Sequence, residues 1–274
     1  MTDSSQNAIR LVVSDVDGTL VTHDKRVTPA TRAAVARLAE LGIGFTVVSS
    51  RPPFGLRKLI ADVGLQLPFG GYNGGAIAKP DLTEIESHFI DEDVARATIE
   101  GLTEAGVGIW FFASGRWLVL DGAGDYVDHE RHTIATDPTV VSDFEAHIGR
   151  AGKIVGVSKD FDRLAQCEGD LAQALGNRAS VARSQAYYLD IGPAGINKGT
   201  FVASLSRIMG IPTSEMAIFG DRENDIPMLK AGGLAIAMGN ASPSAKSAAH
   251  HVTLSNEEDG VAAAVERFIL PQAS

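Results

Sequence analysis

Acidic and amide side chains follow two short apolar runs that are typical of buried strands. They are Asp15 and Asp17 after residues 9–14, and Asp221, Asn224 and Asp225 after residues 215–220. In an open parallel α/β sheet, ligands bind beyond the carboxyl ends of the strands, so we expect these side chains to meet. Four carboxylates in one crevice repel each other unless a cation lies among them. Oxygen ligands of this kind favour a hard divalent ion, above all Mg²⁺.

The elements that would position these residues alternate between strand and helix. Residues 9–14 and 43–48 are apolar strands, and between them a helix begins after Thr28-Pro29 and ends before Gly42. Strand, helix and strand in this order predict a right-handed βαβ unit. The same alternation of strand and helix returns after residue 215. Ser49 and Asn73 are further polar residues at the ends of predicted strands.

The middle of the chain has a different pattern. Residues 109–113 and 116–120 flank Ser114-Gly115 and predict a β-hairpin. Further strands are expected over residues 153–158 and 185–191, and a helix over residues 91–105.

We therefore predict an α/β protein with a Rossmann-like parallel sheet and an inserted α+β domain. The core comprises residues 1–84 and 190–274, and the insertion comprises residues 85–189.

Composition limits the partners of the chain. It has 24 Lys+Arg against 34 Asp+Glu, and a net charge of −10 argues against nucleic acid as a partner. The single cysteine excludes an internal disulfide and a cysteine-based zinc site. Residues 1–7 lack the basic start of a secretory signal, and no apolar run approaches the roughly 18 residues of a membrane span. We expect a cytoplasmic protein without a membrane partner.

Four blocks, in this order, carry a resemblance to a known family. They are Asp15-Val16-Asp17-Gly18-Thr19-Leu20, Ser49 at a strand end, Lys198 in Asn197-Lys198-Gly199, and Gly220-Asp221-Arg222-Glu223-Asn224-Asp225. Together they resemble the motifs of the haloacid dehalogenase (HAD) superfamily of phosphatases. Three more blocks resemble its Cof-type branch, subclass IIB, in which a cap domain is inserted after the third strand. These blocks are Tyr72-Asn73-Gly74-Gly75-Ala76, Met238-Gly239-Asn240-Ala241 and residues 252–261.

The resemblance implies a mechanism and a Mg²⁺ cofactor. Asp15 would attack the phosphorus of a phosphomonoester, and Asp17 would protonate the leaving group and then activate water. Magnesium would be held by Asp15, Asp221, Asp225 and the backbone carbonyl of Asp17. Ser49 and Lys198 would act in catalysis by binding phosphoryl oxygens.

Five further residues are expected to contact the phosphate or the substrate. They are Gly18, Ser50, Arg51, Asn73 and Asn224, with Ser50 at a position where the family commonly has glycine. The expected substrate is a small phosphorylated metabolite, such as a sugar phosphate or a phosphorylated cofactor. A phosphotransferase or phosphomutase that uses the same aspartyl-phosphate, and a catalytically silent phosphate sensor, are alternatives that the motifs leave open. The sequence leaves the oligomeric state open as well.

Two groups in the inserted domain invite a functional interpretation that we do not favour. His129 and His132 have the spacing of a metal pair, with Glu130 between them, but no third ligand is evident, so we expect a solvated segment. Trp110 and Trp117 flank the predicted hairpin turn and are expected to be core residues.

Overall fold

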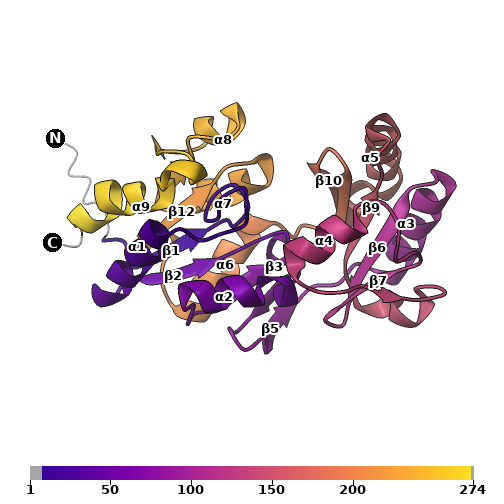
Figure 1. Ribbon diagram of the computed structural model, residues 1–274, viewed down its shortest axis with the longest axis horizontal. Helices are drawn as coiled ribbons and strands as arrows, with labels where there is room; N and C mark the ends of the chain where they lie inside the picture. Colours follow the sequence, from indigo (N-terminus) through magenta and orange to yellow (C-terminus); the bar gives the residue numbers. More distant parts are fainter. Residues whose placement is uncertain (1–7, 273–274) are drawn as a thin grey trace.

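The computed structural model describes residues 8–272 and contains a parallel sheet built from both ends of the chain (Figure 1). Its strand order is β14-β13-β12-β1-β2, and all its neighbours are parallel. The strands are β1 (Leu11–Ser14), β2 (Gly44–Val47), β12 (Met216–Gly220), β13 (Leu234–Ala237) and β14 (His251–Val252). Every residue of β1, β12 and β13 is buried, as expected for strands that are covered on both faces. The predicted parallel α/β core is confirmed.

The connecting helices fix the position of a topological switch point. Helix α1 (Pro29–Glu40) joins β1 to β2, with the Thr28 side chain capping its first turn, and α7 (Ile226–Ala231) follows β12. From the central pair β1 and β12, the chain moves outward in opposite directions. Because both crossovers are right-handed, α1 and α7 cover opposite faces of the sheet. Helix α9 (Gly260–Ala264) packs on α1, and α6 (Lys198–Met209) packs on α7.

A small antiparallel sheet carries the chain from the core to the insertion. It contains β3 (Phe69–Gly71), β4 (Ala76–Ala78) and β5 (Glu84–Ser87), and a bridge between Val48 and Gly70 ties it to the end of β2. Helix α2 (Arg57–Val63) precedes it. The end of the second core strand is therefore connected directly to the segment that leads into the inserted domain.

The inserted domain is built on a six-stranded sheet of order β10-β11-β9-β6-β7-β8. Its strands are β6 (Gly108–Ala113), β7 (Arg116–Val119), β8 (Thr139–Val140), β9 (Ala151–Val157), β10 (Ala179–Gln185) and β11 (Tyr188–Pro193). The expected β6–β7 hairpin is present, with Ser114 and Gly115 at positive φ. The single strand expected over residues 185–191 is wrong, because a two-residue turn at 186–187 separates β10 from β11. That turn contains no Gly, Asn or Pro to signal it.

The two faces of this sheet have different partners. Helices α3 (Glu92–Glu104) and α5 (Phe161–Leu175) cover one face, where Phe111 and Ile154 belong to a buried cluster. The opposite face carries Trp110, Phe112, Trp117, Val155 and Tyr188, and Phe54 of the core packs against this cluster. Both tryptophans are buried, as expected of core residues, although Trp110 also lines a cavity between the two domains.

The core and the inserted domain lie side by side along the long axis of the molecule, with α4 (Val127–Ile134) at their junction (Figure 1). One buried cluster draws on residues 9–78 and 201–269, and another draws only on residues 90–191. The boundaries at 84/85 and 189/190 stay a prediction, and both fall within strands, β5 and β11. Over residues 8–272, no helix has the length and apolar character needed to cross a membrane.

Candidate active site

Three buried carboxylates meet at the switch point. Asp15 directly follows β1, and Asp221 directly follows the neighbouring strand β12. Asp225 lies one turn further along the chain. One carboxylate oxygen from each residue lies within 4.8 Å of the others, and all three residues are buried. The sequence predicted this convergence from the positions of the strand ends.

Lys198 places a single ammonium group between two of these carboxylates. It is the first residue of α6, and Asn197 caps that helix by accepting hydrogen bonds from the backbone of Gly199 and Thr200. The Lys198 side chain is only 1% exposed. Its Nζ donates to Oδ1 of Asp15 and to Oδ1 of Asp225. The lysine therefore belongs to the cluster and is not a solvated residue at a helix start.

The cluster retains an excess of negative charge. Burial raises the pKa of Asp15 well above its ordinary value, although Lys198 opposes this effect. Burial, together with the Asp225 charge, raises the pKa of Asp221 to about 6. Burial lowers the pKa of Lys198, but the charges of Asp15 and Asp225 outweigh it and raise that pKa overall. The Lys198 ammonium and the Arg222 guanidinium, whose Nε lies 3.2 Å from Asp221 Oδ2, do not balance three carboxylates, so the cluster favours a further cation.

The surroundings of Asp221 fit a metal ion. Its Oδ2 is buried and accepts no hydrogen bond, although Nε of Arg222 lies 3.2 Å away, and its Oδ1 accepts from the Thr19 hydroxyl. Gly18 lies against this carboxylate with φ of +89°, and a Cβ there would stand 2.4 Å from Asp221 Oδ2. Glycine thus allows the loop after β1 to reach Asp221. The donor set of Asp15, Asp221 and Asp225 is all oxygen, as hard cations prefer.

Asp225 is bonded differently from the other two carboxylates. Its Oδ2 accepts from the backbone N–H groups of Asp221 and Arg222, and its Oδ1 accepts from Lys198. These bonds hold the loop after β12 in shape. Its expected role as a metal ligand stays a prediction, and its visible role is to orient Asp221 and Lys198.

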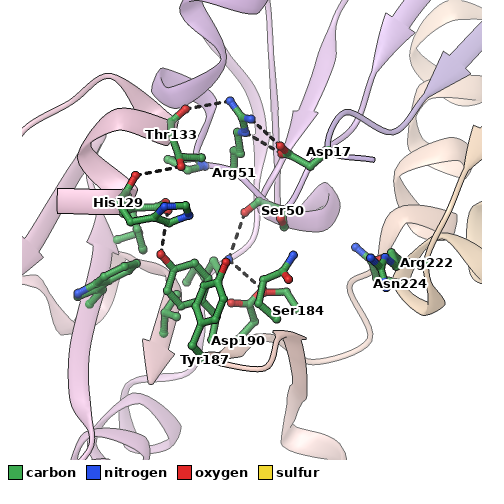
Figure 2. A pocket seen from close by; sticks show the side chains of 18 of the residues that line it. Asp17, Ser50, Arg51, His129, Thr133, Ser184, Tyr187, Asp190, Arg222 and Asn224 are labelled. Atoms are coloured by element: carbon green, nitrogen blue, oxygen red, sulfur yellow. Dashed lines mark hydrogen bonds and ion pairs between the residues drawn. The ribbon is translucent and has the colours of Figure 1, made fainter. Parts of the chain in front are cut away.

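Asp17 lies apart from the cluster and is held by two cations. Arg51 donates through Nε to Oδ2 at 2.7 Å and through Nη2 to Oδ1 at 2.6 Å, and Lys25 donates to Oδ1 at 2.6 Å (Figure 2). Burial raises the pKa of Asp17, but Arg51 and Lys25 outweigh it and hold that pKa well below its usual range. The pKa of Asp15 is thus raised and that of Asp17 lowered, although the two residues are only two positions apart.

The other expected contact residues lie in the same region, and only some of them line the cavity above the carboxylate cluster. Ser49 is buried, and its hydroxyl accepts from the Arg51 N–H at 3.1 Å. Asn224 Nδ2 donates to Asn73 Oδ1 at 3.2 Å, which links the two loops that carry them. A cavity of about 110 Å³ lies above, and the expected residues that line it are Asp15, Asp17, Ser50, Arg51, Asp221 and Asn224. Gly18, Ser49, Asn73, Lys198 and Asp225 are not among its lining residues.

The inserted domain supplies cavity residues that the sequence did not predict. They include Glu130 and His129 of α4, Lys153 of β9, and Tyr188 and Asp190 of β11. The solvated segment expected over residues 129–132 is wrong for Glu130, which is 9% exposed and whose pKa burial raises to about 7.

A signal for Glu130 was present in the sequence. Val127, Glu130 and Ile134 are the buried residues of α4, at helical spacing on one face. His129 and His132 lie on the exposed side, as expected, and belong to no group of three metal-ligating side chains within the part of the chain that the structure describes.

Two asparagines brace the loop after β1 from the C-terminal part of the core. Asn240 Nδ2 donates to the carbonyl of Gly18 at 2.8 Å, and Asn256 Nδ2 donates to the carbonyl of Val21 at 2.9 Å. The backbone N–H of Asn256 also donates to Asn240 Oδ1. The blocks at 238–241 and 252–261 therefore hold the loop after β1 in place by hydrogen bonds.

Comparison with known proteins identifies the relatives of this chain. The family model described as haloacid dehalogenase-like hydrolase matches residues 12–265. The HMP-PP phosphatase of Cronobacter sakazakii is 29% identical over 235 residues, which cover 85% of each chain. A haloacid dehalogenase-like hydrolase from Bacteroides thetaiotaomicron is 29% identical, with a TM-score of 0.87 over 94% of this chain and 99% of its own. A sugar phosphatase of HAD subclass IIB, at 22% identity, shares the fold with a TM-score of 0.83 over 94% of this chain and 98% of its own.

Proposed function

This chain belongs to the haloacid dehalogenase-like hydrolases, and on that premise we propose that it is a magnesium-dependent phosphatase of small phosphorylated metabolites. Membership makes the chain an enzyme, and the phosphatase named among its relatives supports the class of phosphoric monoester hydrolases. The observation that carries the proposal is the pair Asp15 and Asp221 at the switch point, with Lys198 as the only ammonium within the cluster. Its expected cytoplasmic location stays a prediction.

We assign the attack on phosphorus to Asp15. Lys198 holds Oδ1, so the other carboxylate oxygen forms the bond to phosphorus while the bond to the leaving oxygen breaks. The product is an aspartyl-phosphate and an alcohol. Water then attacks the phosphorus of this intermediate, which releases inorganic phosphate and restores the Asp15 carboxylate.

Asp17 is assigned the proton transfers. It would donate a proton to the leaving oxygen in the first step and accept one from water in the second. The resting ion pairs with Arg51 and Lys25 favour its ionised form. A bound phosphate dianion competes for both cations, and any loosening of these pairs raises the pKa of Asp17 toward a value at which it can carry a proton.

The proposed Mg²⁺ would be held by the carboxylates of Asp15 and Asp221 and the backbone carbonyl of Asp17, with Asp225 supporting them. When bound, it supplies positive charge against the phosphoryl oxygens during transfer. Ser49 and Lys198 would bind the same oxygens from the core side. Gly18, Ser50, Arg51, Asn73 and Asn224 would complete the contacts to the phosphate and to the substrate.

The direct test is hydrolysis of p-nitrophenyl phosphate with Mg²⁺ and with EDTA. We expect phosphate release that depends on Mg²⁺ and that falls by about 10³-fold or more in Asp15→Asn, because the nucleophile is lost. Asp24→Asn is the matched control, since the Asp24 side chain is 73% exposed and lies outside the site. Activity in EDTA equal to that with Mg²⁺, or full activity of Asp15→Asn, would overturn the proposal. Phosphate release also separates hydrolysis from transfer to a sugar hydroxyl.

A further inference from the structure

Two charged residues interrupt an otherwise apolar surface above the cavity. On the sheet face that turns toward the core, Lys153 lies in register with Phe112, and Asp190 lies in register with Val155. Both line the cavity, together with Trp110. Figure 2 shows Asp190 and Tyr187 directed into the same space as Ser50 and Arg51. Charged side chains on such a face need partners. Within the described residues, the core supplies a hydrogen-bond acceptor for Lys153 and no hydrogen-bond donor for Asp190.

Asp190 is the residue left without sufficient partners. Its side chain is 10% exposed, and neither Oδ1 nor Oδ2 accepts a hydrogen bond. The Lys153 ammonium forms an ion pair with Asp190, 3.0 Å from Oδ2, and also donates to the carbonyl of Ser50 at 3.2 Å, so Oδ1 is the carboxylate oxygen left without a partner. A buried carboxylate oxygen without a donor is costly, so such groups commonly mark a place where a ligand donates.

Glu130 of α4 adds a second acidic side chain to the lining of the cavity. It is 9% exposed, and the only hydrogen bond of its side chain among the described residues is a long one, 3.4 Å, from the Tyr188 hydroxyl. The other cations that line the cavity already have partners. Arg51 bonds Asp17 and the carbonyl of Thr133, Lys25 bonds Asp17, and Arg222 pairs with Asp221. We call Glu130, Lys153 and Asp190 the cap triad. It offers more acceptors than donors and carries two acidic groups against one ammonium.

The cap triad lies where the leaving group of a substrate would be. Asp15 and Asp17 line the same cavity, so a phosphate at Asp15 directs the rest of the molecule toward the inserted domain. Lys153 and Asp190 also line an adjoining cavity of about 620 Å³, which gives a larger leaving group room to extend.

We propose that the cap triad selects phosphomonoesters whose leaving group carries hydrogen-bond donors, above all an amino group, and disfavours leaving groups with a second acidic group. This inference rests on the proposed function. An ammonium or hydroxyl group would donate to Asp190 and Glu130 and satisfy their free oxygens. A carboxylate in the same place would meet two acidic groups and compete with them for Lys153.

The test compares three six-carbon sugar phosphates: one with an amino group at C2, one with no charged group besides its phosphate, and one open-chain acid with a carboxylate at C1. They are glucosamine 6-phosphate, glucose 6-phosphate and 6-phosphogluconate, measured as kcat/KM at pH 7.5 with Mg²⁺. We expect the amino compound to be preferred over the acidic one by at least about tenfold, with the neutral sugar between them. Equal values for the amino and acidic compounds, or a preference for the acidic one, would overturn the inference.

Variants then test whether the cap triad is the cause. We expect Asp190→Asn and Glu130→Gln each to reduce the ratio of amino to acidic substrate by about fivefold or more, because each removes one acidic group. Asp162→Asn, an exposed change on α5 of the same domain, is the matched control and leaves the ratio unchanged. A ratio unaltered in both cavity variants overturns the inference, and Glu130→Gln carries this test alone if Asp190→Asn does not fold.

The proposed function has a separate readout. Cleavage of p-nitrophenyl phosphate by the wild-type protein needs no donor on the leaving group. Its absence, together with no cleavage of any sugar phosphate, would overturn the phosphatase assignment. Its presence with an indifferent sugar ratio would overturn only the role of the cap triad.

Discussion

Cations are shared unevenly among the carboxylates of the site, and this sharing separates their roles. Lys198 is shared between Asp15 and Asp225, whereas Asp17 is paired with two cations, Arg51 and Lys25. As a result, burial dominates at Asp15 and raises its pKa, while the two cations dominate at Asp17 and lower its pKa. Carboxyl groups whose environments move their pKa values apart are the usual basis for distinct catalytic roles. The geometry thus supports different roles for two residues that the sequence places in one motif.

Replacing Asp17 with asparagine tests its proposed role. We expect Asp17→Asn to lower kcat by about 10²- to 10⁴-fold, because an amide cannot exchange the proton. The Mg²⁺ concentration for half-maximal activity is expected to change little, since the Asp17 side chain is not in the carboxylate cluster. Steady-state rates against Mg²⁺ concentration measure both effects. Unchanged kcat would remove Asp17 from the chemistry, and a large shift in the Mg²⁺ requirement would make it a metal ligand through its side chain.

Glu130 links the stability of the protein to pH. Burial raises its pKa from an ordinary value of 4.5 to about 7, so the folded state favours its neutral form. The stability from this group is fully present below about pH 4.5 and is lost as the pH rises through about 7. The loss corresponds to on the order of 3 kcal/mol.

Glu130→Gln removes this dependence. We expect the variant to gain stability relative to the wild-type protein as the pH is raised from 4.5 to 7.5. Urea unfolding in EDTA at both values measures the difference, and Glu100→Gln, exposed on α3, is the control. An equal difference from the wild-type protein at the two pH values would show that Glu130 does not titrate in this range.

At the scale of elements, strand ends were predictable and contacts between domains were not. Apolar runs located β1 and β12, and the rule for parallel sheets then placed Asp15 beside Asp221. Lys153 and Asp190 carry no such signal, because each is one charged residue within a strand. Their importance follows from the way in which the inserted sheet faces the core, which depends on contacts between residues about 100 positions apart.

The loop after β1 depends on one glycine for its approach to Asp221. A Cβ at Gly18 would stand 2.4 Å from Asp221 Oδ2, whereas Gly42, also at positive φ, has no atom within 4 Å of the same position. We expect both Gly18→Ala and Gly42→Ala to lose about 1–2 kcal/mol of stability from backbone strain. Only Gly18→Ala is expected to lose most of its Mg²⁺-dependent activity. Thermal unfolding and phosphatase assays on the pair separate strain from site damage, and equal activity losses would contradict this account.

At the scale of the whole molecule, two polar contacts beside the cavity join the inserted domain to the core. Arg51 of the core donates through Nη1 to the carbonyl of Thr133 in α4, and Lys153 of the insertion donates to the carbonyl of Ser50. Both contacts involve residues that line the cavity. Closure of the domain over the site and the ion pair of Asp17 therefore share the Arg51 side chain (Figure 2). A substrate phosphate that attracts Arg51 would therefore weaken both its ion pair with Asp17 and its hydrogen bond to Thr133.

Arg51→Lys tests this link between closure and catalysis. A lysine can pair with Asp17, but as a single ammonium it cannot reproduce two bonds to the carboxylate and a third to Thr133. Loss of a charged hydrogen bond of about 1.5–3 kcal/mol predicts a fall in kcat/KM of about 10- to 100-fold. p-Nitrophenyl phosphate is the informative substrate, because its leaving group needs little help from a proton. We also expect a larger radius of gyration by small-angle X-ray scattering, as the inserted domain opens. Arg57→Lys, an exposed change at the start of α2, is the matched control. If Arg51→Lys keeps the wild-type kcat/KM and radius of gyration, the contact with Thr133 does not hold the domain closed.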